Sequence, residues 1–356
     1  MPCPESPSLL RKLGAWWRHW QGPPVLDWVQ VEVTTHCQAA CGYCPRTAWR
    51  EIWENRHLPK EILERLLPAL KRTGYVHLQG WGEPLLHPHF FELVALAKAA
   101  GCRVGTTTNG LLVTEDVAVR LVESGLDVIA FSLAGMGDTH DAWRPGAPYG
   151  QVLAAMRILQ DVKVRLGRTT PAVNIAYMLL RSGLEDLDRL PDEFAGLGLD
   201  QVVISTLDLV AAPELARESL SAAPEAEGAG LSARLEAMAA AAAGRGLRLH
   251  YPRPPAGADP RRCPENVLKA LIVSVQGTVF PCVFQNLPPD GIYYSDGRPH
   301  PCQPLAFGSL QEHSLAEIWR SPDYERFRAA WAGLDLPPSC RHCLKLPKRK
   351  KSGNCE

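Results

Sequence analysis

Residues 34–46 read TTHCQAACGYCPR, and the three cysteines in this stretch, Cys37, Cys41 and Cys44, decide how the rest of the chain is interpreted. They are spaced C-x3-C-x2-C and follow an apolar alternation at residues 29–33, which predicts a strand. Cysteine thiolates hold iron–sulfur clusters, and a cubane cluster has one more iron than three thiolates can ligate. An iron left open can bind a substrate, as open metal sites do in enzymes. The stretch therefore predicts a reactive cluster.

Composition narrows the class of protein. The chain has 356 residues, enough for one large domain and a smaller one, and its 38 basic residues balance its 38 acidic ones. Nothing in this charge balance favours nucleic acid as a partner. No apolar run approaches the roughly 18 residues of a membrane span, and the N-terminus does not resemble a signal peptide. We expect a cytoplasmic protein, in which cysteines more often bind metal than form disulfides.

Strand and helix patterns alternate from residue 28 to about residue 210. Six runs have strand character: 28–34, 75–78, 102–107, 127–133, 173–179 and 201–205. Helical patterns lie between them at 59–71, 90–100, 115–123, 152–164 and 184–197. Strands that each precede a helix pair in parallel. The sequence therefore predicts an α/β fold, a partial (β/α)6 TIM-like barrel whose ligands gather at the carboxyl ends of the strands.

Three segments are expected. Residues 1–27 form an N-terminal helical extension, basic and tryptophan-rich, which could lie on a membrane surface but is better explained as a short helix packed on the main domain. Residues 28–250 form the barrel core, with 211–230 as a mobile connection before an alanine-rich helix. Residues 260–356 form a smaller module that begins after a proline-rich boundary and contains a hairpin at 270–283.

Polar and glycine-rich motifs follow successive predicted strands. Gly82-Glu83-Pro84 comes after the second strand, Thr108-Asn109-Gly110 after the third, and Ser132 ends the fourth. Glycines allow a ligand to approach the backbone closely, and a carboxylate can hold an ammonium group. Each motif alone is weak, but all of them lie at the same end of the predicted barrel.

With these motifs, residues 28–210 resemble the radical S-adenosylmethionine (SAM) superfamily. The resemblance implies that Cys37, Cys41 and Cys44 hold a [4Fe–4S] cluster whose open iron is chelated by the amino and carboxylate groups of SAM. It further implies that Glu83 holds the SAM amino group and that Tyr43 lies near the adenine. The implied cofactor-binding residues are Tyr43, Gly82, Glu83, Pro84, Asn109, Ser132 and Arg144.

The chain departs from the family pattern at two positions. Trp81 stands where the family often has a first glycine, and Ala134 replaces an aspartate that is common in the fourth-strand motif. The resemblance implies that one electron from the reduced cluster cleaves SAM to methionine and a 5′-deoxyadenosyl radical, which removes a hydrogen atom from the substrate. Such chemistry needs a low-potential reductant such as flavodoxin or ferredoxin, and a site that excludes water.

A second cysteine set lies in the C-terminal module. Cys263, Cys282, Cys340 and Cys343 suit either structural zinc or another iron–sulfur cluster. The C-x13-G-x4-C spacing resembles the SPASM extension or its shorter twitch form, which implies one auxiliary [4Fe–4S] cluster on these four residues. Zinc remains the alternative, and Cys302 or Cys355 could replace one ligand.

The main functional hypothesis is oxidation or rearrangement of a small molecule, with the auxiliary cluster as an electron conduit. The 27 residues before the core are too few for a separate leader-peptide domain, which favours a small molecule or an externally presented peptide. The alternative is a peptide or protein maturase of the SPASM type. Two remote alternatives are a non-catalytic iron–sulfur electron carrier and a zinc-stabilised binding module. The basic residues from Lys345 to Lys351 are expected to be a solvated tail, although they could attract an acidic redox protein.

Overall fold

A computed structural model describes residues 24–221, 225–251, 263–333 and 336–346. The predicted N-terminal extension therefore lies outside the described residues, except for its last four positions. Nine strands form one mostly parallel sheet, in the order β7-β6-β5-β4-β3-β2-β1-β8-β9. The predicted α/β partial barrel is confirmed.

The strands of this sheet place the site. Their bounds are β1 Leu26–Val31, β2 Thr73–Leu78, β3 Arg103–Thr108, β4 Val128–Leu133, β5 Ala172–Leu179, β6 Gln201–Thr206, β7 Arg248–His250, β8 Ala270–Val273 and β9 Val279–Phe280. β1 to β7 pair in parallel, β8 pairs in parallel with β1, and β9 returns antiparallel to β8. The carboxyl ends of β1 to β6 therefore point to one mouth of the barrel.

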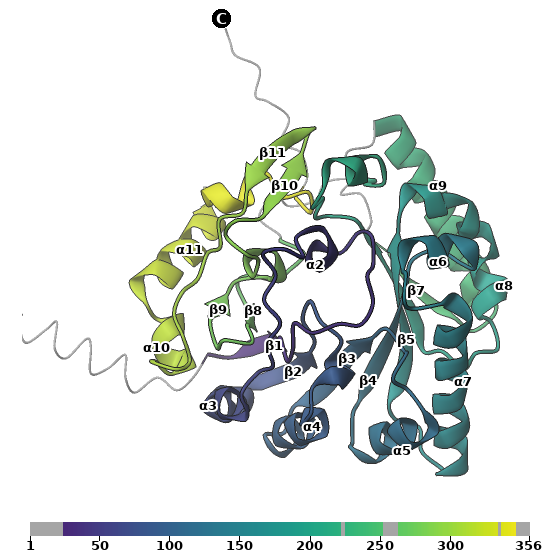
Figure 1. Ribbon diagram of the computed structural model, residues 1–356, viewed down its shortest axis with the longest axis horizontal. Coiled ribbons are helices and arrows are strands. Elements are labelled where there is room, and N and C mark those ends of the chain that lie inside the picture. Colours follow the sequence, from purple (N-terminus) through teal and green to yellow (C-terminus); the bar gives the residue numbers. More distant parts are fainter. Residues whose placement is uncertain (1–23, 222–224, 252–262, 334–335, 347–356) are drawn as a thin grey trace, which may run out of the picture.

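Helices lie along the outside of the curved sheet (Figure 1). They are α3 Lys60–Leu70, α4 Phe90–Ala99, α5 Glu115–Glu123, α7 Tyr149–Arg165, α8 Leu190–Phe194 and α9 Glu225–Ala243. α5 illustrates the sequence logic, because the Thr114 hydroxyl caps it by accepting from the Val117 amide and its buried face is apolar. Among the described residues, no helix is both long and apolar enough to cross a membrane.

Three sequence predictions were wrong. The core has a seventh parallel strand, β7, which is too short and too polar to be recognised from its pattern. The helix expected at 184–197 is a 3-10 turn, η2 Arg181–Arg189, followed by the five-residue α8, with Pro191 in the first turn of α8. The connection expected at 211–230 already contains η3 Pro213–Arg217, and α9 begins at Glu225.

The C-terminal segment continues the barrel sheet before it forms its own module. The predicted hairpin is confirmed as β8–β9, and Gly277 adopts φ +80° in its turn, a conformation that favours glycine. Beyond it come η4 Val283–Gln285, the hairpin β10 Ile292–Ser295 with β11 Arg298–Pro301, α10 Leu315–Trp319, α11 Pro322–Gly333 and η5 Pro338–Cys340. In Figure 1 the β10–β11 hairpin lies above the barrel mouth, near the short helix α2 Pro45–Ala48.

Candidate functional site

The mouth of the barrel encloses a cavity of about 380 Å³, here called the barrel cavity. Of the residues predicted to hold the first cluster and SAM, Cys37, Cys41, Tyr43, Cys44, Gly82, Glu83, Asn109, Ser132 and Arg144 line it. Pro84 does not line it, since it begins the 3-10 turn η1 Pro84–Leu86 behind Glu83. Residues from four successive strand ends therefore meet in one space, as the order of the motifs predicted.

The loop after β1 carries the three cysteines and is held on both sides. The Arg46 guanidinium donates to the carbonyls of Thr35 and Ala39, at 3.2 and 3.3 Å. On the other side, the Gly42 amide donates to the Trp143 carbonyl, and a Cβ on Gly42 would lie 3.2 Å from the Trp143 ring. The loop is therefore pre-formed around the cavity.

Gly82 and Glu83 fix the neighbouring loop against the cysteine loop. The amides of Gly82 and Glu83 donate to the carbonyls of Thr34 and His36, and a Cβ on Gly82 would lie only 2.4 Å from the His36 oxygen. The Glu83 carboxylate, 2% exposed, accepts from the Thr108 hydroxyl and from the Asn109 and Leu85 amides. Burial raises its pKa, while these three donors favour the charged form. The carboxylate thus braces the end of β3 against this loop.

Asn109 reaches the first cysteine. Its side-chain amide lies 3.8 Å from the Cys37 sulfur, and its carbonyl oxygen accepts from the Leu111 amide. Ser132 lies on β4 and also lines the cavity. These positions suit contacts to a ligand bound beside Cys37, and such contacts remain predictions.

Arg144 is a buried cation with spare donor capacity. It is 5% exposed, and its guanidinium donates to the Tyr43 hydroxyl at 2.7 Å. Its Nε is buried and has no hydrogen-bond partner among the described residues. A buried unpaired donor costs stability. The residue also lines the barrel cavity, where its positive charge would favour a carboxylate of a bound ligand.

The thiols of the barrel cavity suit a metal cluster. Burial raises the pKa of Cys37, and burial and the neighbouring Cys41 thiolate raise the pKa of Cys44 to about 12. Deprotonating these thiols together therefore needs a compensating cation, which iron provides. The fit of the residues to an iron–sulfur cluster is good.

A second cavity of about 300 Å³, here called the auxiliary cavity, lies under the C-terminal module. The four cysteines Cys263, Cys282, Cys340 and Cys343 all line it, although they come from three separate segments. Burial is the main cause that raises the pKa of each, to about 12 for Cys263 and about 11 for Cys340. Within the described ranges, no three or more His, Cys, Asp or Glu residues are grouped so that they could hold a single metal ion. Four cysteines lining one cavity suit the four-cysteine ligation of an iron–sulfur cluster.

Cys302 also lines the auxiliary cavity but packs in a different apolar cluster. Its cluster contains Trp49 and Leu287, whereas Cys263, Cys282 and Cys340 pack against the main core. This packing favours the set of four without Cys302. Cys355, the other predicted substitute, lies outside the described residues.

Sequence reasoning missed the residues that separate the two cavities, here called the wall. Four residues line both of them: Asp208, Leu209, Phe284 and Lys345. The expectation that Lys345 belongs to a solvated tail was wrong, because its side chain is 22% exposed and forms an ion pair with Glu265. Residues 348–351 of that tail lie outside the described residues. Asp208 could have been suspected from its position just after β6, at the carboxyl end of a barrel strand.

Comparison with known families finds two matches. Residues 31–190 match the radical SAM superfamily model, and residues 263–344 match SPASM, an iron–sulfur cluster-binding domain. Two similar curated proteins are a tungsten-containing aldehyde ferredoxin oxidoreductase cofactor-modifying protein from Pyrococcus furiosus and a PqqA peptide cyclase from Gluconobacter oxydans. The first is 26% identical and the alignment covers 89% of this chain and 87% of the relative. The second is 28% identical over 91% of this chain and 84% of the relative.

Solved structures share the fold. Streptococcus suis SuiB bound to S-adenosylmethionine superposes with a TM-score of 0.65 at 15% identity, over 90% of this chain and 71% of SuiB. SuiB bound to its precursor peptide SuiA gives a TM-score of 0.62 at 16% identity, over 94% of this chain and 74% of SuiB.

Proposed function

The chain is a radical SAM protein with a C-terminal SPASM-type iron–sulfur domain, and we propose that it modifies a peptide or protein substrate. Its cofactors are SAM, the [4Fe–4S] cluster that binds SAM, and additional iron–sulfur clusters in the SPASM domain. Peptide maturation was the alternative hypothesis of the sequence analysis, and it is now favoured over oxidation of a small molecule.

We assign the cofactors to the two cavities. Cys37, Cys41 and Cys44 would hold the SAM-binding cluster, and the four cysteines of the auxiliary cavity would hold one auxiliary cluster. When bound, the cluster and SAM together supply a 5′-deoxyadenosyl radical that removes a hydrogen atom from the substrate. The protein's contribution is to bind, orient and shield the reacting groups.

The residues of the barrel cavity would perform these tasks. Arg144, which lines the cavity, would attract the SAM carboxylate, and the Glu83 carboxylate would hold in place the loop that receives the SAM amino group. Water would be excluded by an apolar cluster at the mouth, in which the Trp49 and Trp81 indoles also donate to the carbonyls of Ala211 and Asn286. A dry site protects a reactive radical from solvent.

The observation that carries the peptide proposal is the similarity to PqqA peptide cyclase across both domains. The fold shared with SuiB, solved with a precursor peptide, is consistent with it. A second candidate is modification of a cofactor, because the Pyrococcus relative is described as a cofactor-modifying protein and matches nearly the whole chain.

The test uses anaerobically reconstituted full-length protein, a reductant such as flavodoxin or dithionite, SAM, and short peptides encoded beside its gene. The proposal expects a peptide of changed mass that forms together with 5′-deoxyadenosine, and neither product from a Cys41→Ala variant. Release of 5′-deoxyadenosine with every such peptide unchanged, and with a modified cofactor or other small molecule instead, would favour the second candidate.

A further inference from the structure

A buried ion cluster lies in the wall between the two cavities and has no role in the function proposed above. It consists of Asp208, Lys345 and Glu265, whose side chains are 11%, 22% and 13% exposed. Asp208 and Lys345 line both cavities, and Glu265 lines the auxiliary cavity. The three residues come from the barrel and from two cysteine-bearing segments of the C-terminal module.

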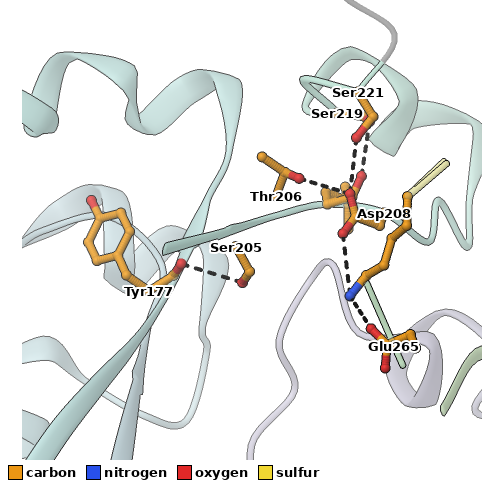
Figure 2. Close-up of polar contacts among 9 residues, drawn as sticks. Tyr177, Ser205, Thr206, Asp208, Ser219, Ser221 and Glu265 are labelled. Atoms are coloured by element: carbon orange, nitrogen blue, oxygen red, sulfur yellow. Dashed lines mark hydrogen bonds and ion pairs between the residues drawn. The ribbon is translucent and has the colours of Figure 1, made fainter. Parts of the chain in front are cut away.

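Asp208 is held firmly on the barrel side. Its Oδ1 accepts from the hydroxyls of Thr206 and Ser221, at 2.8 and 3.0 Å, and Ser219 fixes the same turn by donating to the Leu207 carbonyl (Figure 2). Its other oxygen lies 3.8 Å from the Lys345 ammonium. These contacts keep the carboxylate at the wall.

Lys345 joins Asp208 to the auxiliary cavity. Its ammonium donates to Glu265 and lies 5.0 Å from the centre of the Phe284 ring. It stands two residues after Cys343 in the chain. One residue therefore brings a positive charge beside a proposed cluster ligand.

The charges of this ion cluster lie beside the cysteines of the auxiliary cavity. Asp208, Glu265 and Lys345 line that cavity together with Cys263, Cys282, Cys340 and Cys343. Glu265 is two residues from Cys263 and Lys345 is two residues from Cys343. A nearby positive charge favours extra negative charge on an iron–sulfur cluster bound there, and a nearby negative charge disfavours it. The reduction potentials of iron–sulfur clusters respond to such charges and hydrogen bonds.

We propose that the Asp208–Lys345–Glu265 ion cluster sets the reduction potential of the auxiliary iron–sulfur cluster. Reduction adds one electron and makes the cluster more negative, so the Lys345 cation favours the reduced form and the Asp208 carboxylate favours the oxidised form. Because Asp208 and Lys345 also face the barrel cavity, this control lies where the substrate would be bound. The inference rests on an auxiliary cluster at these four cysteines and not on the identity of the substrate.

The experiment is a redox titration of the auxiliary cluster, followed by electron paramagnetic resonance. It uses the full chain with Cys37, Cys41 and Cys44 replaced by Ala, so that the auxiliary cluster gives the signal. In this background, Lys345→Met should lower the midpoint potential and Asp208→Asn should raise it. Each should change the ratio of reduced to oxidised cluster at fixed potential by about tenfold, which is about 59 mV for a one-electron couple. The double variant should return close to the starting value.

Controls separate charge from structure. Lys345→Arg keeps the cation and should leave the midpoint near its starting value, as should Lys71→Met, which removes an exposed lysine after α3. Unmoved midpoints in both Lys345→Met and Asp208→Asn, or shifts of the same sign in both, would overturn the inference. If the protein without Cys37, Cys41 and Cys44 gave no auxiliary-cluster signal, both the inference and the assignment of its ligands would be overturned. An unmodified peptide in the maturation assay would contradict only the proposed function.

Discussion

Replacing Gly82 with Ala tests whether the contact between the cysteine loop and the next loop builds the SAM site. The new Cβ would lie 2.4 Å from the His36 carbonyl oxygen and 2.5 Å from that of Thr34, both backbone atoms of the cysteine loop. Relieving this overlap must move the two loops apart and weaken the hydrogen bonds from the Gly82 and Glu83 amides. Two backbone hydrogen bonds at about 1 kcal/mol each, plus about 1–3 kcal/mol for overpacking, give roughly 3–5 kcal/mol.

Part of this cost would appear as lost SAM binding, because 3 kcal/mol corresponds to on the order of a hundredfold in affinity. Equilibrium binding of SAM to the reconstituted protein and the free energy of unfolding in urea measure the two effects. Gly150→Ala is the matched control, since a Cβ there meets nothing within 4 Å and the residue lies in α7; it should be neutral or slightly stabilising. If Gly82→Ala bound SAM and iron as well as Gly150→Ala does, the contact between the two loops would not be needed for the SAM site, and the reasoning would be refuted.

Three further predictions concern other parts of the molecule. Arg144→Met should weaken SAM binding at least tenfold while Tyr43→Phe weakens it less, because only the first removes the positive charge at the barrel cavity; equilibrium binding compares them. Cys302→Ala should keep the full iron content and Cys282→Ala should lose about four irons per chain, as iron analysis would show, and equal losses would contradict the ligand set. His77, whose pKa burial lowers to about 4, stays neutral in the folded state while the unfolded chain takes up its proton near pH 6.5, so stability is lost as pH falls from 6.5 towards 4. Urea unfolding should show that His77→Gln loses less stability between pH 7.5 and 5.5 than the original protein does, by on the order of 1 kcal/mol.

The sequence predicted those parts of the fold that depend on local pattern. Six barrel strands appear within a few residues of their predicted ranges, because alternating apolar residues and glycine-terminated helices are local signals. The three cysteines and the motifs at the strand ends were found for the same reason. β7 was missed because a three-residue strand carries too little pattern, and it exists because it can pair with β6.

The residues in the wall between the cavities could not be predicted from local sequence pattern. A single aspartate after a strand has no signature of its own, and a lysine in a basic run is most simply read as solvated. Only the folded chain brings Asp208 and Glu265 next to Lys345, where the three charges form an ion cluster. Long-range pairing of this kind follows from topology and not from composition.

The order of the strands links the two cysteine-bearing regions. β8 lies between β1 and β9, pairing in parallel with β1 and antiparallel with β9, so the cysteine loop after β1 and the segment that carries Cys282 after β9 extend from one continuous sheet. Glu32, just after β1, strengthens this link, because its buried carboxylate accepts from the Trp81 amide and from the Asn286 side chain. The strands β8 and β9 of the C-terminal segment therefore extend the barrel sheet. A change that loosens the contact between Glu32 and Asn286 should consequently disturb both cavities together, even though neither residue is a proposed cluster ligand.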